Sequence, residues 1–379
     1  MPTIKLSLFY ILIAIAIGCG PKQSSNNDVL NKVTLSQHPK IKKIIDSADH
    51  YELQVMLSTI DRQNDTVTFT DYQFRVDDSN YFYPASTVKL PISLLALEKL
   101  DQDPRFDRNS LFYVDGDTLE TTFAKEITKI FAISDNEAYN RLFEYLGKDY
   151  INKALKDKGI SPLRISHRLS TPDAHNPMSK AIIFHQNDST LSQIQSKTSK
   201  AVERLNLKSV YKGKGYIDSN DSLVLEPFNF ATKNYLPISS LHGIMKRIIF
   251  PDAFSKKEQF HLSPSDREFV LHAMSSVPRA LGFEEQEYYD SYGKFLIYGD
   301  THERIPESIK IYNKVGYAYG YLTDCAYIYD KESSTEFIVT ANLLVNESGI
   351  FNTGDYQYDT VGIPFLAELG RELLETLKH

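Results

Sequence analysis

The alternation of hydrophobic and polar residues predicts β-strands at both ends of the chain. Residues 53–60 form an apolar run, and residues 66–74 alternate apolar side chains with threonines after the polar turn 61–65. Three more strands are predicted toward the other end of the chain, over residues 309–312, 323–329 and 336–345. The two groups of strands are far apart in sequence, so a sheet that contains both must be closed by long-range pairing.

Helical periodicity flanks these strands and fills the middle of the chain. Ile41, Ile44 and Ile45 recur at helical spacing within 39–48, and residues 364–377 form an amphipathic closing helix. Further helical patterns cover residues 90–97, 123–133, 136–146 and 268–274. We therefore expect an α+β protein whose sheet is assembled from both chain ends, with a helical lobe inserted between them.

The first residues have the features of an export signal. Lys5 lies in front of the apolar run 6–17, which is too short to cross a bilayer as a helix, so residues 1–18 are predicted to be a signal peptide. The run ends at Cys19 in a sequence that resembles the bacterial lipobox, which implies a lipoprotein with lipid on Cys19. Residues 19–36 would then be a polar tether that anchors the protein to a bacterial membrane in the cell envelope, facing the periplasm. An ordinary secretory signal with an incidental cysteine is the alternative.

Composition and charge narrow the possible functions. The 379 residues include 42 basic and 49 acidic side chains, a net charge of −7, so no basic excess indicates a nucleic-acid partner. The ten histidines have no paired spacing typical of metal sites, and glycine-rich phosphate loops are absent, so we expect no metal and no cofactor. With Cys19 lipidated, Cys325 has no partner for a disulfide. The composition does not indicate an oligomeric state.

The tetrapeptide from Ser86 to Lys89 is the strongest chemical feature of the sequence. Residues three apart are neighbours on a helix, and a partly desolvated lysine beside a serine can act as the base that the hydroxyl needs to become a nucleophile. The same S-x-x-K pattern occurs at Ser209 and Ser291, but only Ser86 precedes a long apolar helix. The alternatives are a helix-capping serine and a solvent-exposed lysine.

Two further short motifs follow residues 86–89 along the chain. The Ser-Asp-Asn run 134–136 follows an apolar helix, and the Lys-Val-Gly run 314–316 follows a strand. With residues 86–89 they resemble the S-x-x-K, S-D-N and K-T-G motifs of serine β-lactamases and penicillin-binding proteins. The chain is most similar to class A β-lactamase-like serine hydrolases, over about residues 40–375.

This resemblance implies a fold and a division of the chain. It implies a five-stranded antiparallel sheet with flanking terminal helices, an inserted all-helical lobe, and an active site in the cleft between them. The catalytic domain would span residues 37–379, with 37–85 and 309–379 in the α/β lobe and 86–308 in a mainly helical lobe. Insertions relative to a compact class A enzyme are expected near 180–230 and 283–305.

The resemblance also implies catalytic roles. Ser86 would be acylated with Lys89 as its base, and Ser134 would carry a proton to the leaving nitrogen. Asn136 would hold Lys89 and the substrate amide, while Lys314 would attract a substrate carboxylate. The alternative for residues 134–136 is a helix N-cap, which is compatible with the catalytic role.

The resemblance places an oxyanion hole at the third motif. Gly316 would let the strand approach the ligand closely, and the backbone N–H groups of Ser86 and Tyr317 would hold the oxyanion. Val315, however, stands where the family has a hydroxyl that helps to bind the substrate carboxylate. A hydrogen bond to a charged group is worth about 1.5–3 kcal/mol, so carboxylate recognition should differ here.

A second departure concerns the loop that activates the deacylating water in class A enzymes. The matching residues, 168–177, contain no glutamate. Asp173 is a possible replacement carboxylate, although it is one methylene shorter, and a turn-capping role is its alternative.

We therefore expect an envelope serine hydrolase that forms an acyl-Ser86 intermediate on β-lactams or related amide or peptide bonds. Its substrate would be a small molecule or peptide that bears a carboxylate. The first alternative is a penicillin-binding D-alanyl peptidase or an esterase-like hydrolase. The second is a non-catalytic envelope binding protein on the same scaffold.

Overall fold

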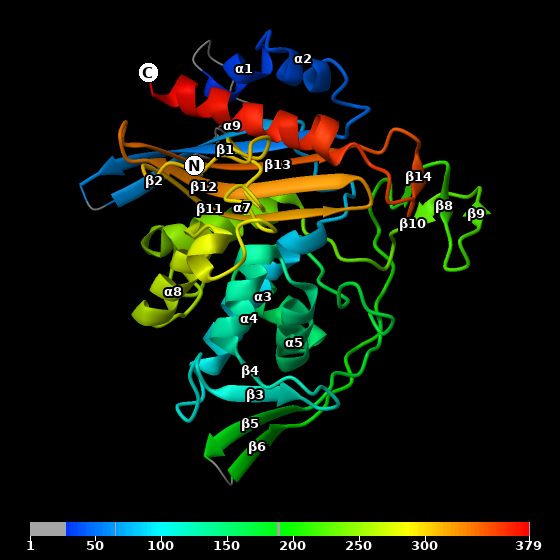
Figure 1. The fold of residues 1–379 in the computed structure, drawn as a ribbon, viewed down its shortest axis with the longest axis vertical. Helices are drawn as coiled ribbons and strands as arrows, with labels where there is room; N and C mark the ends of the chain where they lie inside the picture. Colours follow the sequence, from blue (N-terminus) through cyan, green and yellow to red (C-terminus); the bar gives the residue numbers. More distant parts are fainter. Residues whose placement is uncertain (1–27, 65, 188–189, 379) are drawn as a thin grey trace, which may run out of the picture.

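The centre of the computed structural model, which describes residues 28–64, 66–187 and 190–378, is a five-stranded antiparallel sheet (Figure 1). In spatial order its strands are β11 (Ile309–Ala318), β12 (Tyr321–Asp330), β13 (Thr335–Leu344), β1 (Gln54–Gln63) and β2 (Thr66–Phe74). Val55 of β1 lies opposite Ala341 of β13 and Phe74 of β2, so the N-terminal hairpin joins the C-terminal meander directly. The predicted sheet from both chain ends is confirmed.

The burial of each strand explains its sequence pattern. β12 is buried along almost its whole length, because helices cover both faces of the sheet, and its residues are mostly apolar apart from Thr323 and the buried Asp324 and Asp330. β2 is an edge strand in which exposed and half-buried positions largely alternate, and its threonines occupy exposed positions.

Three helices cover one face of the sheet: α1 (Val29–Thr34), α2 (Pro39–Ile45) and α9 (Ile363–Leu377), as Figure 1 shows. Leu30 and Val33 of α1 are buried in the same apolar cluster as Leu373 of α9. The prediction that the tether extends over 19–36 is therefore wrong for its last part, because α1 belongs to the packed domain. The predicted signal peptide and Cys19 lie outside the described residues.

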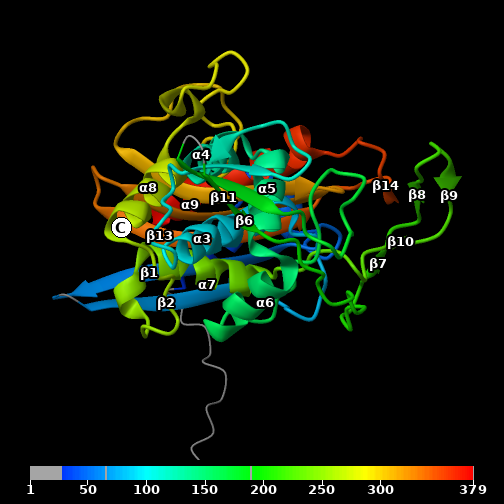
Figure 2. The same ribbon diagram turned by 90° about the horizontal axis from the view of Figure 1, so that it is seen from below.

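The other face carries the inserted lobe (Figures 1 and 2). Its helices are α3 (Lys89–Leu100), α4 (Phe123–Ile133), α5 (Asn136–Leu146), α6 (Lys148–Asp157), α7 (Ile238–Ile249) and α8 (Pro264–Ser275). α3 is buried on all sides apart from Lys99, which explains why apolar residues occupy most of its positions from Leu90 to Leu97. The lobe is not all-helical as expected, because a four-stranded sheet lies at its far end. That sheet contains, in spatial order, β4 (Thr121–Thr122), β3 (Leu111–Val114), β5 (Ile182–Asn187) and β6 (Thr190–Ile194).

The two expected insertions have different structures. The first continues from β6 as an extended segment with four short strands: β7 (Tyr211–Lys212), β8 (Gly215–Ile217), β9 (Leu223–Val224) and β10 (Phe228–Asn229). β8 pairs with β14 (Ile350–Phe351), so this segment is tied to the C-terminal part of the chain. The second insertion, 283–305, has no described helix or strand. Its residues Phe295, Leu296 and Ile297 are nevertheless buried in the same apolar cluster as α9.

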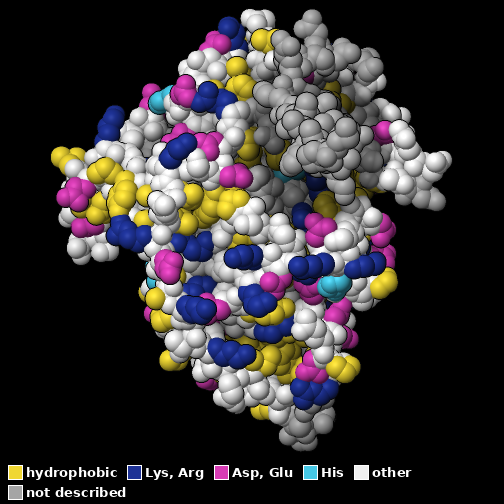
Figure 3. Space-filling model, turned by 180° about the vertical axis from the view of Figure 1, so that it is seen from behind, with side chains coloured by type: hydrophobic (Ala, Val, Ile, Leu, Met, Phe, Trp, Pro, Cys, Tyr) yellow, Lys and Arg dark blue, Asp and Glu magenta, His cyan; other side chains and the backbone are white. Residues whose placement is uncertain are grey.

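Short one-turn helices complete the fold. They are η1 (Ala85–Val88), η2 (Pro251–Ala253), η3 (Pro278–Leu281) and η4 (Tyr358–Gly362). None of the helices in the described part of the chain has the length and hydropathy needed to cross a membrane. Seen from behind, basic and acidic side chains are interspersed over the coloured surface (Figure 3).

Strand β11 packs directly on the turn η1, and Gly316 makes this contact possible. A Cβ atom on Gly316 would lie 2.6 Å from the carbonyl oxygen of Pro84 and 2.8 Å from the backbone nitrogens of Ser86 and Thr87. Such distances are far below van der Waals contact, and the atoms concerned belong to the backbone. Any side chain at residue 316 would therefore push the strand away from Ser86.

Gly316→Ala should lower the free energy of unfolding by about 1–3 kcal/mol, the usual cost of overpacking a tight contact. Gly243→Ala is the matched control, because its Cβ in α7 meets only the flexible end of Arg247 at 3.1 Å and alanine favours a helix over glycine by about 1 kcal/mol. Urea unfolding of both variants measures the difference. Equal stability of the two variants would contradict the close approach of β11 to η1.

Candidate active site

Ser86 lies in η1, immediately before α3, on a strained turn. Ala85 has a φ of 46°, a conformation that residues with a side chain rarely adopt. The carbonyl oxygen of Pro84 accepts hydrogen bonds from the Thr87 amide at 3.1 Å and the Thr87 hydroxyl at 2.7 Å, which closes the turn. Ser86 does not cap the helix, and among the described residues its hydroxyl has no hydrogen-bond partner. It is partly exposed and lines a cavity of about 460 Å³.

Lys89 points into the protein from the first turn of α3. Its side chain is fully buried, so the alternative of a solvent-exposed lysine is wrong. Its Nζ donates to the Ser134 carbonyl oxygen and, at 2.7 Å, to Asn136 Oδ1. Burial holds the pKa of Lys89 well below its usual value, the charge of Lys314 lowers it further, and Asp135 opposes the shift. A lysine in this environment can accept a proton.

Ser134 and Asn136 reach Lys89 from the junction between α4 and α5. Ser134 ends α4 in the left-handed conformation, with a φ of 57°. The N-cap of α5 is Asp135, which accepts a hydrogen bond from the Ala138 amide at 2.7 Å. Asp135 therefore caps α5, and the side chains of Ser134 and Asn136 contact Lys314 and Lys89 instead.

Lys314 approaches the same serine from the sheet. Its Nζ donates to Ser134 Oγ at 2.8 Å and to the Val315 carbonyl oxygen at 3.0 Å. Ser134 Oγ also lies 3.4 Å from Lys89 Nζ, so one hydroxyl stands between two amines. Burial lowers the pKa of Lys314 to about 7, against the opposing charge of Asp324. This arrangement can pass a proton between Lys89, Ser134 and Lys314.

A buried polar network fixes β11 behind Lys314. Asn313 donates to Asp324 Oδ1 at 2.9 Å and accepts from Lys294 Nζ at 3.0 Å. The other oxygen of Asp324 accepts from the Phe295 and Leu296 amides, and burial raises the pKa of Asp324 to about 6. The second insertion is therefore bonded to β11, which carries Lys314, and to the neighbouring strand β12.

The predicted oxyanion hole depends on the contact between β11 and η1. Gly316 brings the strand against the Ser86 backbone, and Tyr317 lines the same cavity as Ser86. Tyr317 also lines a second cavity, of about 170 Å³, together with Ser134 and Lys314. The two cavities meet around Tyr317, beside the motifs predicted from the sequence.

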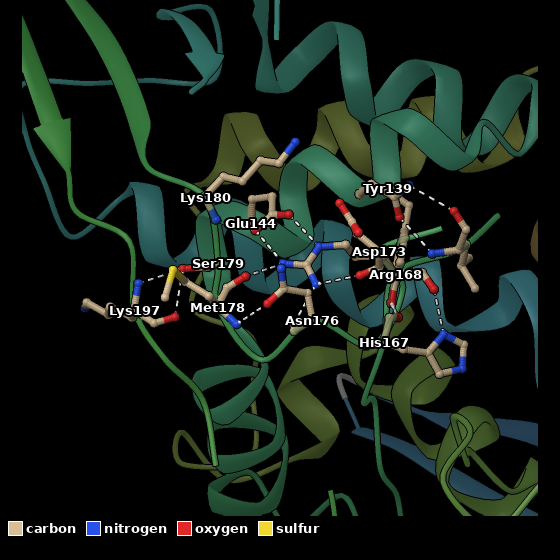
Figure 4. A network of polar contacts seen from close by, with 12 residues as sticks. Tyr139, Glu144, His167, Arg168, Asp173, Asn176, Met178, Ser179, Lys180 and Lys197 are labelled. Atoms are coloured by element: carbon tan, nitrogen blue, oxygen red, sulfur yellow. Dashed lines mark hydrogen bonds and ion pairs between the residues drawn. The ribbon is translucent and has the colours of Figure 1, made fainter. Parts of the chain in front are cut away.

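A buried ion pair holds the loop that was predicted to supply a deacylating carboxylate (Figure 4). The Arg168 guanidinium pairs with both carboxylate oxygens of Glu144, and both side chains are buried. Arg168 also donates to the carbonyl oxygens of Asn176 and Met178. At the near end of the loop, the Ser170 hydroxyl accepts from Asn136 Nδ2 at 2.9 Å.

Asp173 does not join the cluster around Ser86. Asp173 is exposed and lines a different cavity of about 250 Å³, which also contains Glu144 and Arg141 and adjoins the Ser86 cavity at Arg168 and Thr171. None of the described residues that line the Ser86 cavity is an aspartate or a glutamate. The expectation of Asp173 as a deacylating carboxylate therefore has no support in this geometry, because the loop turns it toward a different cavity.

Three residues at the Ser86 cavity were not foreseen from the sequence. They are Ser170, His167 and Lys233. Ser170 lies in the loop examined for a carboxylate, but its hydrogen bond to Asn136 could not be read from the spacing. The imidazole of His167 is buried, which lowers its pKa to about 3, and its Nδ1 lies 2.6 Å from the Arg168 carbonyl oxygen. A lone lysine in a loop, such as Lys233, carries no sequence signal.

The described residues contain one group of side chains with metal-ligating atoms close together, formed by His38, Glu368 and Glu372. It lies between α2 and α9, and Glu368 also pairs with Arg371. None of its members lines the Ser86 cavity.

Comparison with known families identifies the relatives of this architecture. Residues 38–207 match the model of the β-lactamase enzyme family. This match includes the first two motifs and the loop around Arg168, and it agrees with the resemblance predicted from the sequence. A comparison with curated protein sequences finds no match.

Solved β-lactamase structures share the fold. A β-lactamase from Xanthomonas campestris is 14% identical over 92% of this chain and 98% of its own, with a TM-score of 0.53. A β-lactamase from Streptomyces albus G is 14% identical over 88% of this chain and 96% of its own, with a TM-score of 0.50. At such identities the likeness establishes the β-lactamase fold alone, and this confirms the expected fold class.

Proposed function

From the β-lactamase fold and the family match over residues 38–207, we propose that this protein is a serine hydrolase that forms an acyl-enzyme at Ser86. The observation that carries the proposal is the pair of buried lysines, Lys89 and Lys314, on either side of the Ser134 hydroxyl. A structural role alone does not require two buried amines beside one serine, since burial of a charge is costly. Proton transfer does require groups with lowered pKa values.

The proposed acylation assigns one step to each of these groups. The Ser86 oxygen attacks the carbonyl carbon of an amide, and its proton passes to the Lys89 amine. The backbone N–H groups of Ser86 and Tyr317 hold the oxyanion. When the carbon–nitrogen bond breaks, the proton reaches the leaving nitrogen through the Ser134 hydroxyl. Asn136 holds Lys89 in place through the hydrogen bond to its Nζ.

The substrate class follows from the cation at the leaving-group side. We propose a β-lactam or a related peptide bond with a carboxylate near the scissile amide, attracted by Lys314. Val315 is buried and supplies no hydroxyl, so the carboxylate depends more on this amine than it would with a neighbouring hydroxyl donor.

Hydrolysis of the acyl-enzyme should be slow. A water molecule needs a base to attack the ester, and no carboxylate side chain among the described residues lines the Ser86 cavity. Within the proposal, a penicillin-binding peptidase or slow hydrolase is therefore favoured over an efficient β-lactamase. A non-catalytic binding protein on the same scaffold is the competing proposal, favoured by Val315 and the altered loop.

We further propose, from the sequence alone, that the protein is exported and held at a bacterial membrane by lipid on Cys19. The described domain begins with α1, close behind this predicted anchor.

Labelling with a fluorescent penicillin tests the nucleophile. We expect a stoichiometric adduct on the purified protein and none on Ser86→Ala, because Ser86 is the proposed nucleophile and precedes the buried Lys89 by three residues. Ser209→Ala is the matched control, because its S-x-x-K pattern ends in the short strand β7 and is not helical. Mass spectrometry of the intact protein and its peptides locates the adduct. Equal labelling of the wild type and Ser86→Ala would refute the proposal, and no labelling of either would favour the binding protein.

Adding a carboxylate to the loop tests the slow second step. With the chromogenic β-lactam nitrocefin, the wild type should give a burst of about one equivalent followed by slow turnover. Ser170→Glu should raise the steady-state rate by about tenfold or more, because general bases contribute 10²–10⁴-fold when well placed. Ser170→Gln has the same shape without the base and should not do so. Rapid wild-type turnover without a burst would contradict the missing-base argument.

The pH dependence of acylation tests Lys314. Its pKa of about 7 means that the amine is mostly protonated below this pH and mostly neutral above it. The protonated form attracts a carboxylate and lowers the pKa of Lys89. Over the pH range in which Lys89 is already neutral, the second-order rate constant of acylation should therefore fall as the pH rises through about 7. In Lys314→Arg, which stays charged, this fall should disappear below about pH 9. Stopped-flow acylation measures both profiles, and thermal melts check the folding of the variant.

A further inference from the structure

On the proposed acylation mechanism, the two cavities beside Ser86 would hold different halves of the substrate. Ser134 and Lys314 line the smaller cavity, and Ser134 is the group that would protonate the leaving nitrogen. The leaving group therefore occupies the smaller cavity. The acyl part, bonded to the Ser86 oxygen, must extend into the larger cavity, which contains Ser86, Ser170 and Lys233.

Lys233 is the notable residue of this larger cavity. Its side chain is partly buried, and the described residues give it no ion pair with an acid. Its ammonium group lies 5.9 Å from the centre of the Tyr319 ring, which also lines the cavity. Burial alone lowers the pKa of Lys233. The cation is therefore partly desolvated without a carboxylate to balance it.

The other charged groups of this cavity do not neutralise Lys233. Arg168 is paired with Glu144, whose carboxylate lines the separate cavity that contains Asp173. His167 has a pKa of about 3 and stays neutral at neutral pH. Since none of the described lining residues is acidic, the acyl-side cavity has a positive potential.

The backbone that carries Lys233 is held in place on several sides. Arg164 donates from its guanidinium to the carbonyl oxygens of Ala231 and Lys233. The Ser166 hydroxyl donates to the Thr232 carbonyl oxygen at 3.1 Å, and the Tyr81 hydroxyl donates to the Asn234 carbonyl oxygen at 2.9 Å. A further backbone bond joins the Leu205 amide to the Ala231 carbonyl oxygen at 2.8 Å. The ammonium group is thus presented from a fixed segment.

We propose that Lys233 binds an anionic substituent on the acyl part of the substrate. The inference rests on the proposed function and names its substrate class more closely: a molecule with one anion near the leaving nitrogen, at Lys314, and a second on the acyl side, at Lys233. A carboxylate fits this role. It would give the partly buried Lys233 ammonium the counter-ion that the described residues do not provide.

Penicillins with one nucleus and three acyl side chains test the proposal. Benzylpenicillin has a neutral side chain, the α-carboxybenzyl analogue an anionic one, and the α-aminobenzyl analogue a cationic one. Second-order rate constants of Ser86 acylation are measured by competition with a fluorescent penicillin at about pH 6.5 and low salt. We expect the wild type to react about tenfold faster with the anionic than with the cationic probe. Added salt should reduce this ratio, because it screens the charge.

Variants test whether Lys233 causes the preference for the anionic probe. Lys233→Met removes the charge and keeps the apolar stem, so the ratio should fall to about one while the neutral probe reacts within about twofold of the wild type. Lys233→Arg should keep the preference. Lys331→Ala, in the exposed turn between β12 and β13, is the matched control for net charge and should also keep it.

The outcomes separate this inference from the proposed function. Adducts at Ser86 with all three probes, at a ratio that Lys233→Met does not change, would overturn the role of Lys233 and leave the acyl-enzyme intact. A wild-type ratio of one at low salt would do the same without any variant. The absence of Ser86 adducts with every probe would instead sink the proposed function, and this inference with it.

Discussion

The candidate site depends on the burial of two lysine side chains around one serine hydroxyl. Lys89 and Lys314 arrive from opposite lobes and both contact Ser134, and neither forms an ion pair with a carboxylate among the described residues. Taking an ammonium ion out of water costs several kcal/mol, and two like charges at close range add to the cost. The protein lowers this cost by lowering the pKa of both amines. The same burial that disfavours the charged lysine makes it a base.

The surrounding structure holds this unfavourable arrangement together. Ala85 and Ser134, the residues that set the direction of Ser86 and Asn136, both have positive φ angles, which only a well-packed environment maintains. Gly316 then allows the sheet to meet the Ser86 turn without a side chain between them. Asp324 supports β11 from behind through bonds to Asn313 and to two backbone amides. Strain near Ser86 is offset by packing and hydrogen bonds farther away.

Periodicity in the sequence was sufficient for the long elements and insufficient for the short ones. Residues 66–74, 123–133 and 136–146 have the predicted bounds, because each has an amphipathic pattern long enough to recognise. The helix α1 was mistaken for tether, since only Leu30 and Val33 anchor it and its neighbours are polar. The strands of the small sheet were missed because segments of two to six residues show little periodicity. The layout of the elements predicted a sheet assembled from both chain ends, but not the pairing of β1 with β13, because alternation cannot reveal a partner strand.

Some of the site residues could be predicted from the sequence and others could not. The motifs predicted the groups that meet at Ser134, and the structure brings Lys89 and Lys314 to it, with Asn136 bonded to Lys89. Spacing could not predict which way a loop residue faces. For this reason the expectation for Asp173, which lines another cavity, could not be checked from the sequence. Nor could it predict Lys233, whose significance lies in the absence of a nearby acid among the described residues. An isolated cation is a property of three-dimensional surroundings and leaves no trace in the sequence.

The loop after α6 shows how the two steps of the proposed reaction can be separated. The loop is held by the buried ion pair between Arg168 and Glu144. The Glu144 carboxylate lines the Asp173 cavity and does not line the Ser86 cavity. Breaking such a pair costs about 3–5 kcal/mol, so its charges are committed to the structure and are not free to activate water. The side chain that does reach Asn136 is the Ser170 hydroxyl, a weak base at neutral pH. Within the proposed reaction, this arrangement would favour formation of the acyl-enzyme over its hydrolysis, and the protein would hold its substrate for longer than it takes to react with it.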